Sequence, residues 1–225
     1  MTKEVNSVVH VIDNPYLQEM LTRLRDKNTS YVDFRKILEE LGYLLGIELS
    51  RSLTLEEVYV ETPLRVKARG IRIKDVDNIV LIAILRASLP FIWGLLKAYP
   101  KAKLGIIVAR RVEEHVKYTS EGMVFDVEIS YENTPYINEN TVVIIADPMI
   151  ATGSTIRKVL LRIRENKPKK VIIVSVIATN YAIKRISEVY DKIEFYTLSI
   201  DKELDSRGYI IPGLGDAGDR SFGTP

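Results

Sequence analysis

The sequence contains no cysteine, only two histidines and a single tryptophan among its 225 residues. Without cysteine the chain forms no disulfide, carries no catalytic thiolate and offers no cysteine-ligated zinc site. The two histidines, His10 and His115, lie far apart along the chain. We therefore expect surface or packing roles for both of them rather than metal ligation.

Long apolar runs and an excess of one charge are also missing. The longest apolar stretches, such as residues 79–85, fall well short of the roughly 18 residues that cross a bilayer. The first fifteen residues are too polar for a secretory signal. The net charge of +2 gives no indication of a nucleic-acid or membrane surface. We expect a soluble cytoplasmic protein with neither nucleic-acid nor membrane partners.

The chain does have enough apolar residues, 46% of the total, to build one large core. Five β-branched runs are continuous rather than alternating, which is typical of strands covered on both faces. Helix-like segments at 90–98, 154–166 and 182–190 lie between or after them. This alternation predicts an α/β fold with a parallel sheet. The runs are NIVLIAIL (78–85), LGIIVAR (104–110), TVVIIAD (141–147), KVIIVSVIA (170–178) and IEFYTLSI (193–200).

The N-terminal third predicts two helices, at 14–25 and 31–49. Ser30 followed by Asp33 resembles a capping box at the start of the second helix. An apolar stripe then follows at helical spacing. We interpret the stripe as core packing, with a dimer contact as the alternative. Its members are Ile37, Leu38, Leu41, Leu44 and Leu45.

Two further segments stand apart from this pattern. Residues 111–131 predict a β-hairpin arm, with a turn near Glu121 and Gly122. Such an arm closes over a site, contacts another subunit or is a simple excursion. The segment 208–225 holds five of the twelve glycines but also several large apolar residues. We expect an ordered loop whose backbone approaches a ligand closely.

The stretch from Val142 to Leu160, VVIIADPMIATGSTIRKVL, joins a strand to a helix through a short turn. Amide groups at a helix N-terminus favour an anion, and the hydroxyls of the turn add donors. A nucleotide-triphosphatase loop needs a lysine after its glycines, which is absent after Gly153. The turn therefore favours a phosphate monoester, with Asp147 accepting hydrogen bonds from sugar hydroxyls. An ordinary strand–turn–helix with a capped helix is the alternative.

Three motifs and the N-terminal region resemble the uracil phosphoribosyltransferase family. DPMIATGST (147–155) resembles its phosphoribosyl-diphosphate motif, and ILRAS (84–88) its pyrophosphate loop. GYIIPGLGDAGDRSFGT (208–224) is similar to its uracil-binding C-terminus, and RDKNTS (25–30) to an N-terminal signature. Ser88 stands where the family usually has glycine, and Ser154-Thr155 replaces Gly-Ser. The segment after residue 111 departs most from the family pattern.

The resemblance implies a single domain over residues 1–225, built on a type I phosphoribosyltransferase core flanked by helices. A small hood, formed by the N-terminal segment and residues 201–225, holds the base, and the arm spans about 111–131. The implied reaction joins uracil to 5-phospho-α-D-ribose 1-diphosphate, giving UMP and diphosphate. No covalent nucleophile is required, because catalysis rests on positioning and on stabilising the charge of the leaving group.

The roles of individual residues follow from the matched motifs. The resemblance implies catalytic roles for Asp147, Arg86 and Arg111, although Arg110 competes with Arg111 for the diphosphate. Mg²⁺ is the implied cofactor, held mainly by the diphosphate with no direct protein ligand, and Asp216 faces the phosphoribosyl diphosphate through magnesium or water. The implied phosphoribosyl-diphosphate contacts are Arg86, Arg111, Asp147, Pro148, Met149, Ile150, Ala151, Thr152, Gly153, Ser154, Thr155 and Asp216, and the implied uracil contacts are Ile210, Gly215, Asp216 and Ala217.

Three other functions are compatible with these motifs. A transferase for another base, an RNA-binding regulator on the same core and a non-catalytic nucleotide sensor are the rivals. The regulator needs a basic face, for which KPKK (167–170) is the densest cluster. The resemblance also implies a homodimer or homotetramer and possible GTP or CTP effectors. Arg25, Lys27 and Thr29 would then belong to an effector site or a subunit interface.

Overall fold

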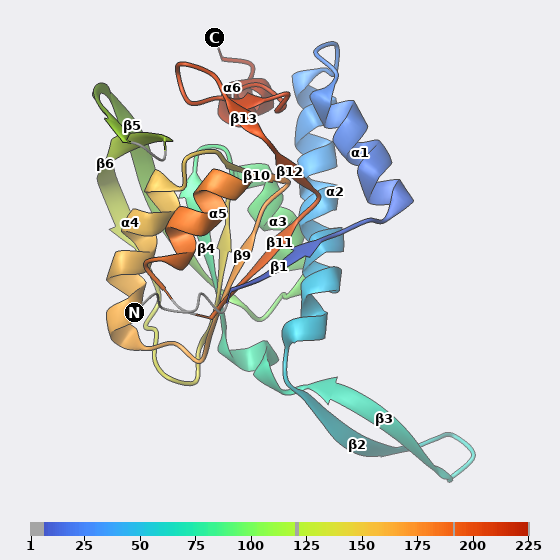
Figure 1. Cartoon of the computed structure of the whole chain (residues 1–225). Helices are drawn as coiled ribbons and strands as arrows, with labels where there is room; N and C mark the ends of the chain where they lie inside the picture. The colour runs from blue at the N-terminus through green and yellow to red at the C-terminus, as the bar shows by residue number, and fades with distance from the viewer. Residues whose placement is uncertain (1–6, 120–121, 191, 225) are drawn as a thin grey trace.

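A seven-stranded sheet forms the centre of the computed structural model, which describes residues 7–119, 122–190 and 192–224 and only the backbone of 113–115 (Figure 1). The strand order is β1-β11-β9-β7-β4-β5-β6, and every neighbouring pair is parallel except β5 with β6. The predicted parallel sheet is thus confirmed. The strands are β1 (Val8–Val11), β4 (Ile79–Leu85), β5 (Lys103–Thr119), β6 (Gly122–Asn133), β7 (Val142–Ala146), β9 (Lys170–Val174) and β11 (Ile193–Thr197).

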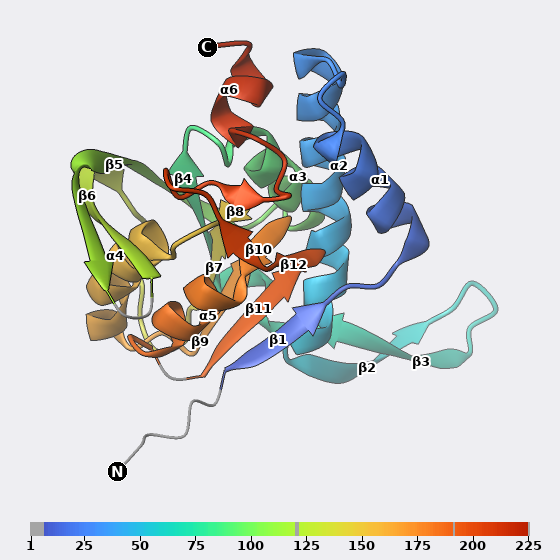
Figure 2. The ribbon, with the colours of Figure 1, turned by 45° about the horizontal axis from the view of Figure 1, so that its top comes forward.

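Helices cover both faces of this sheet. On one face lie α1 (Pro15–Arg25), α2 (Tyr31–Leu49) and α3 (Leu89–Ala98), and on the other lie α4 (Ser154–Ile163) and α5 (Asn180–Ser187) (Figure 2). Alternate residues of β4 and β7 belong to the two separate core clusters, as the side-chain alternation of a strand requires. Burial on both faces is why these strands lack an alternating sequence pattern.

Two of the predicted strands are each divided in the structure. KVIIVSVIA gives β9 and then β10 (Ile177–Thr179), and IEFYTLSI gives β11 and then β12 (Ser199–Asp201). The later pieces form a second, parallel sheet in which β12 pairs with β10 and β10 pairs with β8 (Met149–Ile150). The chain changes sheet where the backbone N–H of Ser175 donates to the carbonyl of Tyr196, outside the ladder of either sheet.

The predicted helices are confirmed, with small shifts at their ends. Ser30 caps α2, because its hydroxyl accepts from the backbone N–H of Asp33 at 3.1 Å and donates to the Asp33 carboxylate at 2.7 Å. Thr179 caps α5 by accepting from Ala182 N–H, so this helix starts two residues before the predicted position and ends earlier. In the α2 stripe, four of the five apolar side chains are buried and Leu44 is half-buried, which confirms core packing.

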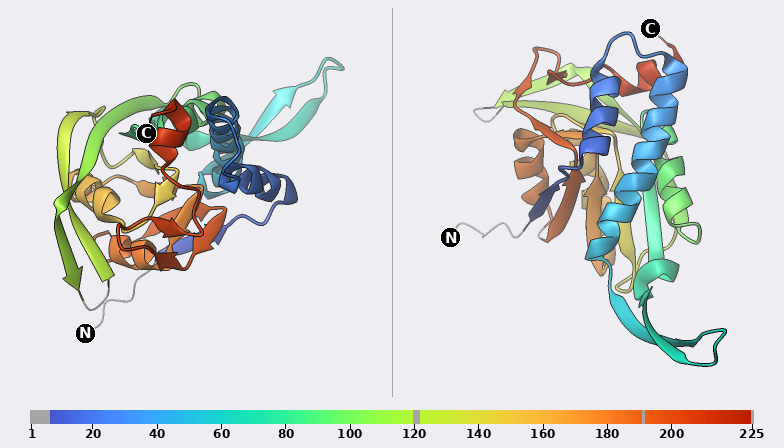
Figure 3. Two further views of the ribbon diagram at one scale, coloured as in Figure 1. Left: turned by 90° about the horizontal axis from the view of Figure 1, so that it is seen from above. Right: turned by 90° about the vertical axis from the view of Figure 1, so that its right-hand side faces the viewer.

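A second hairpin was not predicted. It consists of β2 (Leu55–Glu61) and β3 (Lys67–Ile73), which pair antiparallel and project from the body (Figure 1). Figure 3 shows that it lies on the side of the molecule opposite the β5–β6 hairpin. Its side chains are mostly exposed on both faces, so its sequence carries no strand-like apolar alternation.

The predicted arm is formed by the long extensions of β5 and β6 beyond the sheet. Its turn at 120–121 and the side chain of His115 lie outside the described residues. The C-terminal segment is ordered, as predicted: β13 (Glu203–Leu204) pairs with β14 (Ile210–Ile211), and α6 (Ala217–Phe222) follows. No helix in the described parts of the chain is long and apolar enough to span a membrane.

Close packing of α2 on α3 depends on glycine. A Cβ at Gly94 would lie 1.9 Å from the carbonyl oxygen of Glu39 and 2.5 Å from the backbone nitrogen of Tyr43. Both atoms belong to the α2 backbone, so no side-chain rotation relieves the clash. The two helices approach closely because α2 has Gly42 and α3 has Gly94 at the crossing.

We predict that Gly94→Ala lowers the free energy of unfolding by about 2–4 kcal/mol, because the helices must separate to admit the methyl group. Urea denaturation measures the change. Gly70→Ala in β3 is the matched control, since its new Cβ would lie 3.8 Å from the nearest atom. A change in Gly94→Ala no larger than in this control would contradict the packing account.

Candidate active site

The carboxyl ends of β4 and β7 mark the point at which the strand order reverses direction. From β4 the chain passes through α3 to β5 on one side, and from β7 through α4 to β9 on the other. Loops at such a point diverge and leave a crevice for a ligand. Arg86 follows β4 directly and Asp147 follows β7 directly, so both stand at the mouth of this crevice.

A cavity of about 560 Å³ occupies this crevice. Its walls come from the loop after β4, the middle of β5, the turn after β7 and the C-terminal segment. The structure thus brings together the predicted site residues from motifs that are far apart in sequence. Those that line the cavity are Arg86, Arg111, Asp147, Met149, Ile150, Ala151, Thr152, Gly153, Ser154, Thr155, Ile210, Gly215, Asp216 and Ala217.

Pro148 is the one predicted site residue that does not line the cavity. It is buried, and its carbonyl accepts hydrogen bonds from the N–H groups of Val176 and Ile177, both at 3.1 Å. Ile150 does reach the cavity wall but is 2% exposed and belongs to the core on the α4 side. Both residues therefore support the turn from behind.

The turn itself is shaped by Gly153, which has φ +73° and precedes α4. A side chain there would be strained, and its Cβ would lie 3.1 Å from the carbonyl of Ala182. The hydroxyls of Thr152 and Ser154 are buried and bond to each other at 3.1 Å. The Thr152 hydroxyl thus donates inside the turn. That the hydroxyls of Ser154 and Thr155 and the backbone amides at the start of α4 bind an anion stays a prediction.

A buried arginine, Arg185, lies beneath this turn and was not among the predicted site residues. Arg185 in α5 is 8% exposed, and its guanidinium donates to the carbonyl of Thr152 and, at 3.3 Å, to Ser154 Oγ. Among the described residues no carboxylate forms an ion pair with it. A buried guanidinium without a carboxylate partner adds positive potential to the turn. No local sequence signal indicates this role, because the contact joins positions 33 residues apart.

Asp147 is partly buried, and it borders the cavity. Its Oδ1 accepts from the backbone N–H of Met149 at 3.2 Å. Burial raises the pKa of Asp147 to about 7, although the hydrogen bond from Met149 and the charge of Arg111 oppose the rise. The carboxyl group thus titrates near neutral pH until a ligand with donor groups stabilises its charged form.

The two neighbouring arginines on β5 point in opposite directions, as successive strand residues do. Arg110 is 76% exposed and pairs with Glu128 on β6, with Nη2 at 2.6 Å from Oε2. Arg111 instead lies between the rings of Phe125 and Tyr209, at 5.0 and 5.6 Å from their centroids. Its Nη1 donates to the carbonyl of Gly208 at 3.3 Å. Arg111 is therefore the arginine directed at the C-terminal segment.

One wall of the cavity is formed by Arg86, which follows β4, and by the start of α6. Arg86 is 59% exposed and its Nη2 lies 3.0 Å from Asp219 Oδ1. Asp216 caps α6 by accepting from the N–H of Asp219 at 2.9 Å, which leaves its second oxygen available. Tyr209 also lines the cavity and was not among the predicted contacts, although it stands inside the motif GYIIPGLGDAGD.

Comparison with known proteins gives a consistent picture. Residues 11–224 match the family model described as uracil phosphoribosyltransferase. A uracil phosphoribosyltransferase of Sulfurisphaera tokodaii is 52% identical over 95% of this chain and 98% of its own length. One from Sulfolobus acidocaldarius is 47% identical, over 96% and 99%. One from Thermococcus gammatolerans is 44% identical, over 95% and 92%.

Among solved structures, the AQ2163 protein from Aquifex aeolicus is similar over nearly the whole chain. It superposes with a TM-score of 0.84 and 34% sequence identity. The match covers 96% of this chain and 98% of that one. The overall fold described above is therefore shared by an independent chain.

The raised pKa of Asp147 makes stability depend on pH. Between pH 3.8 and about 7 the folded protein keeps a proton on Asp147 that the unfolded chain has lost, so this residue lowers stability as the pH rises through that interval. Asn has the same shape and no charge. We predict that the melting temperature of Asp147→Asn exceeds that of the unaltered protein by a margin that widens by roughly 3–6 °C from pH 5 to pH 8.

Thermal melts of both proteins across this pH range, without ligand, give the comparison. A constant margin for Asp147→Asn would mean that Asp147 is ionised throughout this range.

Proposed function

The chain belongs to the uracil phosphoribosyltransferase family, and from this membership we propose how its cavity carries out the reaction. The reaction joins uracil to 5-phospho-α-D-ribose 1-diphosphate and gives UMP and diphosphate, a pentosyl transfer in pyrimidine salvage. The observation that carries the assignment of roles is that one cavity unites the turn after β7, the loop after β4 and the C-terminal segment.

The 5-phosphate binds at the turn. Residues 151–155 line the cavity at the N-terminus of α4, where the helix dipole favours an anion, and their backbone amides are the proposed donors. The buried charge of Arg185 beneath the turn supports the same site. Asp147, at the end of β7, accepts hydrogen bonds from the ribose hydroxyls with the oxygen that Met149 does not use.

The diphosphate binds between Arg86 and Arg111. A planar guanidinium suits paired phosphate oxygens, and both arginines line the cavity. Arg86 exchanges its pairing with Asp219 for the diphosphate when the substrate enters. As the bond from C1 of the ribose to the diphosphate breaks, the diphosphate takes the electron pair and these cations stabilise its charge.

The base binds against the C-terminal segment. Uracil presents a carbonyl, an N–H and a second carbonyl along one edge, and the backbone at Ile210, Gly215, Asp216 and Ala217 can complement that pattern. Held there, N1 of uracil bonds to C1 of the ribose as the bond from C1 to the diphosphate breaks, and the N1 proton passes to water or to the departing diphosphate. Residues 201–225, with α1 and the start of α2, form the proposed hood of a single domain over residues 1–225.

Mg²⁺ is the proposed cofactor, and the side chains present fit a metal held chiefly by the substrate. The described residues contain no group of three or more His, Asp or Glu side chains arranged to hold a metal. Asp216 keeps one free oxygen in the cavity, which suits contact with the ion through water. When bound, the ion neutralises charge on the diphosphate.

Assembly and regulation follow the family resemblance. The β2–β3 hairpin exposes Tyr59, Leu64, Val66 and Ile71 to solvent, each by more than half, and this favours a homodimer or homotetramer over a monomer. GTP and CTP are the effectors to test. Sedimentation, combined with titration of activity by these nucleotides, addresses both points. A cytoplasmic location is the accompanying expectation.

The alternative function, an RNA-binding regulator, has little support from the distribution of charged side chains. In the basic cluster 167–170, Lys169 pairs with Asp75, and Lys170 pairs with Glu194 at 2.7 Å. These partners reduce the free positive charge that phosphate contacts require.

We predict that the purified chain, given phosphoribosyl diphosphate and Mg²⁺, forms product from uracil with kcat/KM about 10⁴-fold above cytosine, orotate or hypoxanthine, because mismatched bases leave buried groups unpaired. Chromatography of the nucleotide products measures this.

Asp147→Asn, which keeps the side-chain shape, should form UMP at least a hundredfold more slowly. Product from another base, or tight RNA binding without product, would contradict the proposal.

A matched pair of variants separates the two arginines of β5. We predict that Arg111→Ala lowers kcat/KM about a hundredfold or more, since it removes a cation from the diphosphate. Arg110→Ala should stay within about threefold of the unaltered enzyme, because the exposed guanidinium of Arg110 is paired with Glu128 on β6, although Arg110 borders the cavity as Arg111 does. Steady-state kinetics decide the matter, and a larger loss in Arg110→Ala would reverse the assignment.

A further inference from the structure

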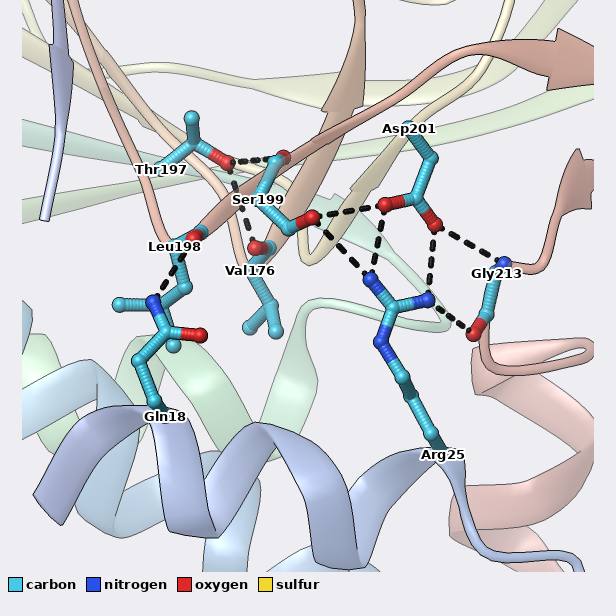
Figure 4. A network of polar contacts seen from close by, with 8 residues as sticks. All are labelled: Gln18, Arg25, Val176, Thr197, Leu198, Ser199, Asp201 and Gly213. Atoms are coloured by element: carbon cyan, nitrogen blue, oxygen red, sulfur yellow. Dashed lines mark hydrogen bonds and ion pairs between the residues drawn. The ribbon is translucent and has the colours of Figure 1, made fainter. Parts of the chain in front are cut away.

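A network of polar contacts joins the end of α1 to the C-terminal segment (Figure 4). Its centre is the ion pair of Arg25 with Asp201, the last residue of β12. Arg25 Nη1 lies 2.8 Å from Asp201 Oδ2 and Nη2 lies 2.7 Å from Oδ1, so the pair is bidentate. Ser199 accepts from Arg25 at 3.1 Å and donates to Asp201 at 2.7 Å. The pairing geometry therefore fixes both side chains.

This ion pair holds both backbone groups of Gly213. The N–H of Gly213 donates to Asp201 Oδ2 at 2.9 Å, and its carbonyl accepts from Arg25 Nη1 at 2.7 Å. Gly213 has φ +58°, and a Cβ there would lie 2.1 Å from the carbonyl oxygen of Ile210. The chain thus turns sharply between Ile210 and Gly215, and the ion pair clamps the middle of that turn.

A second arginine makes the reverse connection. Arg220 in α6 donates to the carbonyls of Leu24 and Asp26, which flank Arg25, and to the carbonyl of Leu214 at 2.7 Å. The end of α1 therefore donates to the C-terminal segment through Arg25, and the C-terminal segment donates to the end of α1 through Arg220. At the other end of α1, Gln18 donates to the carbonyl of Leu198 at 2.9 Å, so the helix is fixed to the sheet at both ends.

The carboxylate of Asp201 is kept in its charged form although its side chain is only 4% exposed. Burial alone would raise the pKa of Asp201, but the hydrogen bonds from Arg25, Ser199 and Gly213 outweigh it and hold the pKa below its ordinary value. Removing one partner of such a pair leaves a buried charge uncompensated. The turn at Gly213 would then lose its anchor.

None of Arg25, Asp201 and Gly213 lines the cavity, whereas Ile210 and Gly215 on either side of the turn do. The network therefore acts on the cavity only through the backbone that it holds. In the described parts of the chain no hydrogen bond joins the turn at 151–155 directly to Arg25, Asp201 or Gly213. That turn is held instead by Arg185 and by Thr179, which pairs with Asp201 in the β10–β12 ladder and donates to the carbonyl of Ala151 at 2.6 Å.

From this arrangement we infer that Arg25 and Asp201 are positioning residues for the base, which set the backbone of the C-terminal segment at the spacing that uracil requires. This assigns to Arg25 of the RDKNTS segment an internal role rather than a place in an effector site or subunit interface. The inference rests on the proposed function, since it specifies how the base half of that site is built.

The test uses Arg25→Met and Arg25→Lys in the full chain. Methionine removes all five donors, whereas lysine keeps the charge without the planar fork. We expect Arg25→Met to raise the KM for uracil by tenfold or more and Arg25→Lys to give an intermediate value. The KM for phosphoribosyl diphosphate should stay within twofold in both. Asp201→Asn, which breaks the pair from the other side, should repeat this selective effect if its melting curve shows a folded protein.

Asp75→Asn is the matched structural control. Asp75 is similarly buried, with its side chain 6% exposed against 4% for Asp201, and pairs with Lys169 at the opposite end of the sheet from the cavity. It should lower the melting temperature without changing either KM by more than twofold. A KM for uracil within twofold of the unaltered enzyme in Arg25→Met, or equal rises in both KM values, would overturn the inference. An unaltered chain that makes no UMP would overturn the proposed function itself.

Discussion

The reversal of strand order between β4 and β7 is the constraint on which the site depends. Parallel strands bring their carboxyl ends to one edge, and the reversal makes the loops after β4 and β7 diverge there. Arg86 and Asp147 stand at these two ends because each directly follows its strand. The continuous burial of both strands, on both faces, fixes their positions and hence those of the two side chains.

The remaining half of the site is not part of this sheet and needs separate support. The C-terminal segment has two short strands and one short helix, so its own secondary structure does little to position it. Arg25, Asp201 and Arg220 supply the missing contacts through backbone groups of residues 213–214 and 24–26. A glycine-rich backbone can then approach a ligand closely while side chains behind it provide rigidity. The glycines thus allow close approach of the backbone, and the contacts of Arg25, Asp201 and Arg220 hold that backbone in place.

Much of this could be predicted from the sequence, because strong local signals mark it. Continuous β-branched runs indicated the parallel sheet, Ser30 with Asp33 indicated the start of α2, and all but one of the predicted site residues line the cavity. The β2–β3 hairpin escaped prediction because it buries neither face. The hydrogen bond from Thr152 to Ser154 was not predicted, since only the folded turn brings these two hydroxyls together. Arg185 and Arg25 act across 33 and 176 residues of sequence, distances at which no local pattern carries information.

The central claim is that the turn at 151–155 and the segment at 208–218 form two halves of one site, spanned by a single nucleotide. Hydrogen–deuterium exchange with added UMP tests it most directly. UMP should slow exchange of the amides in both segments, whereas ribose 5-phosphate should slow it only in 151–155. Protection of one segment alone by saturating UMP, or of neither, would contradict the account.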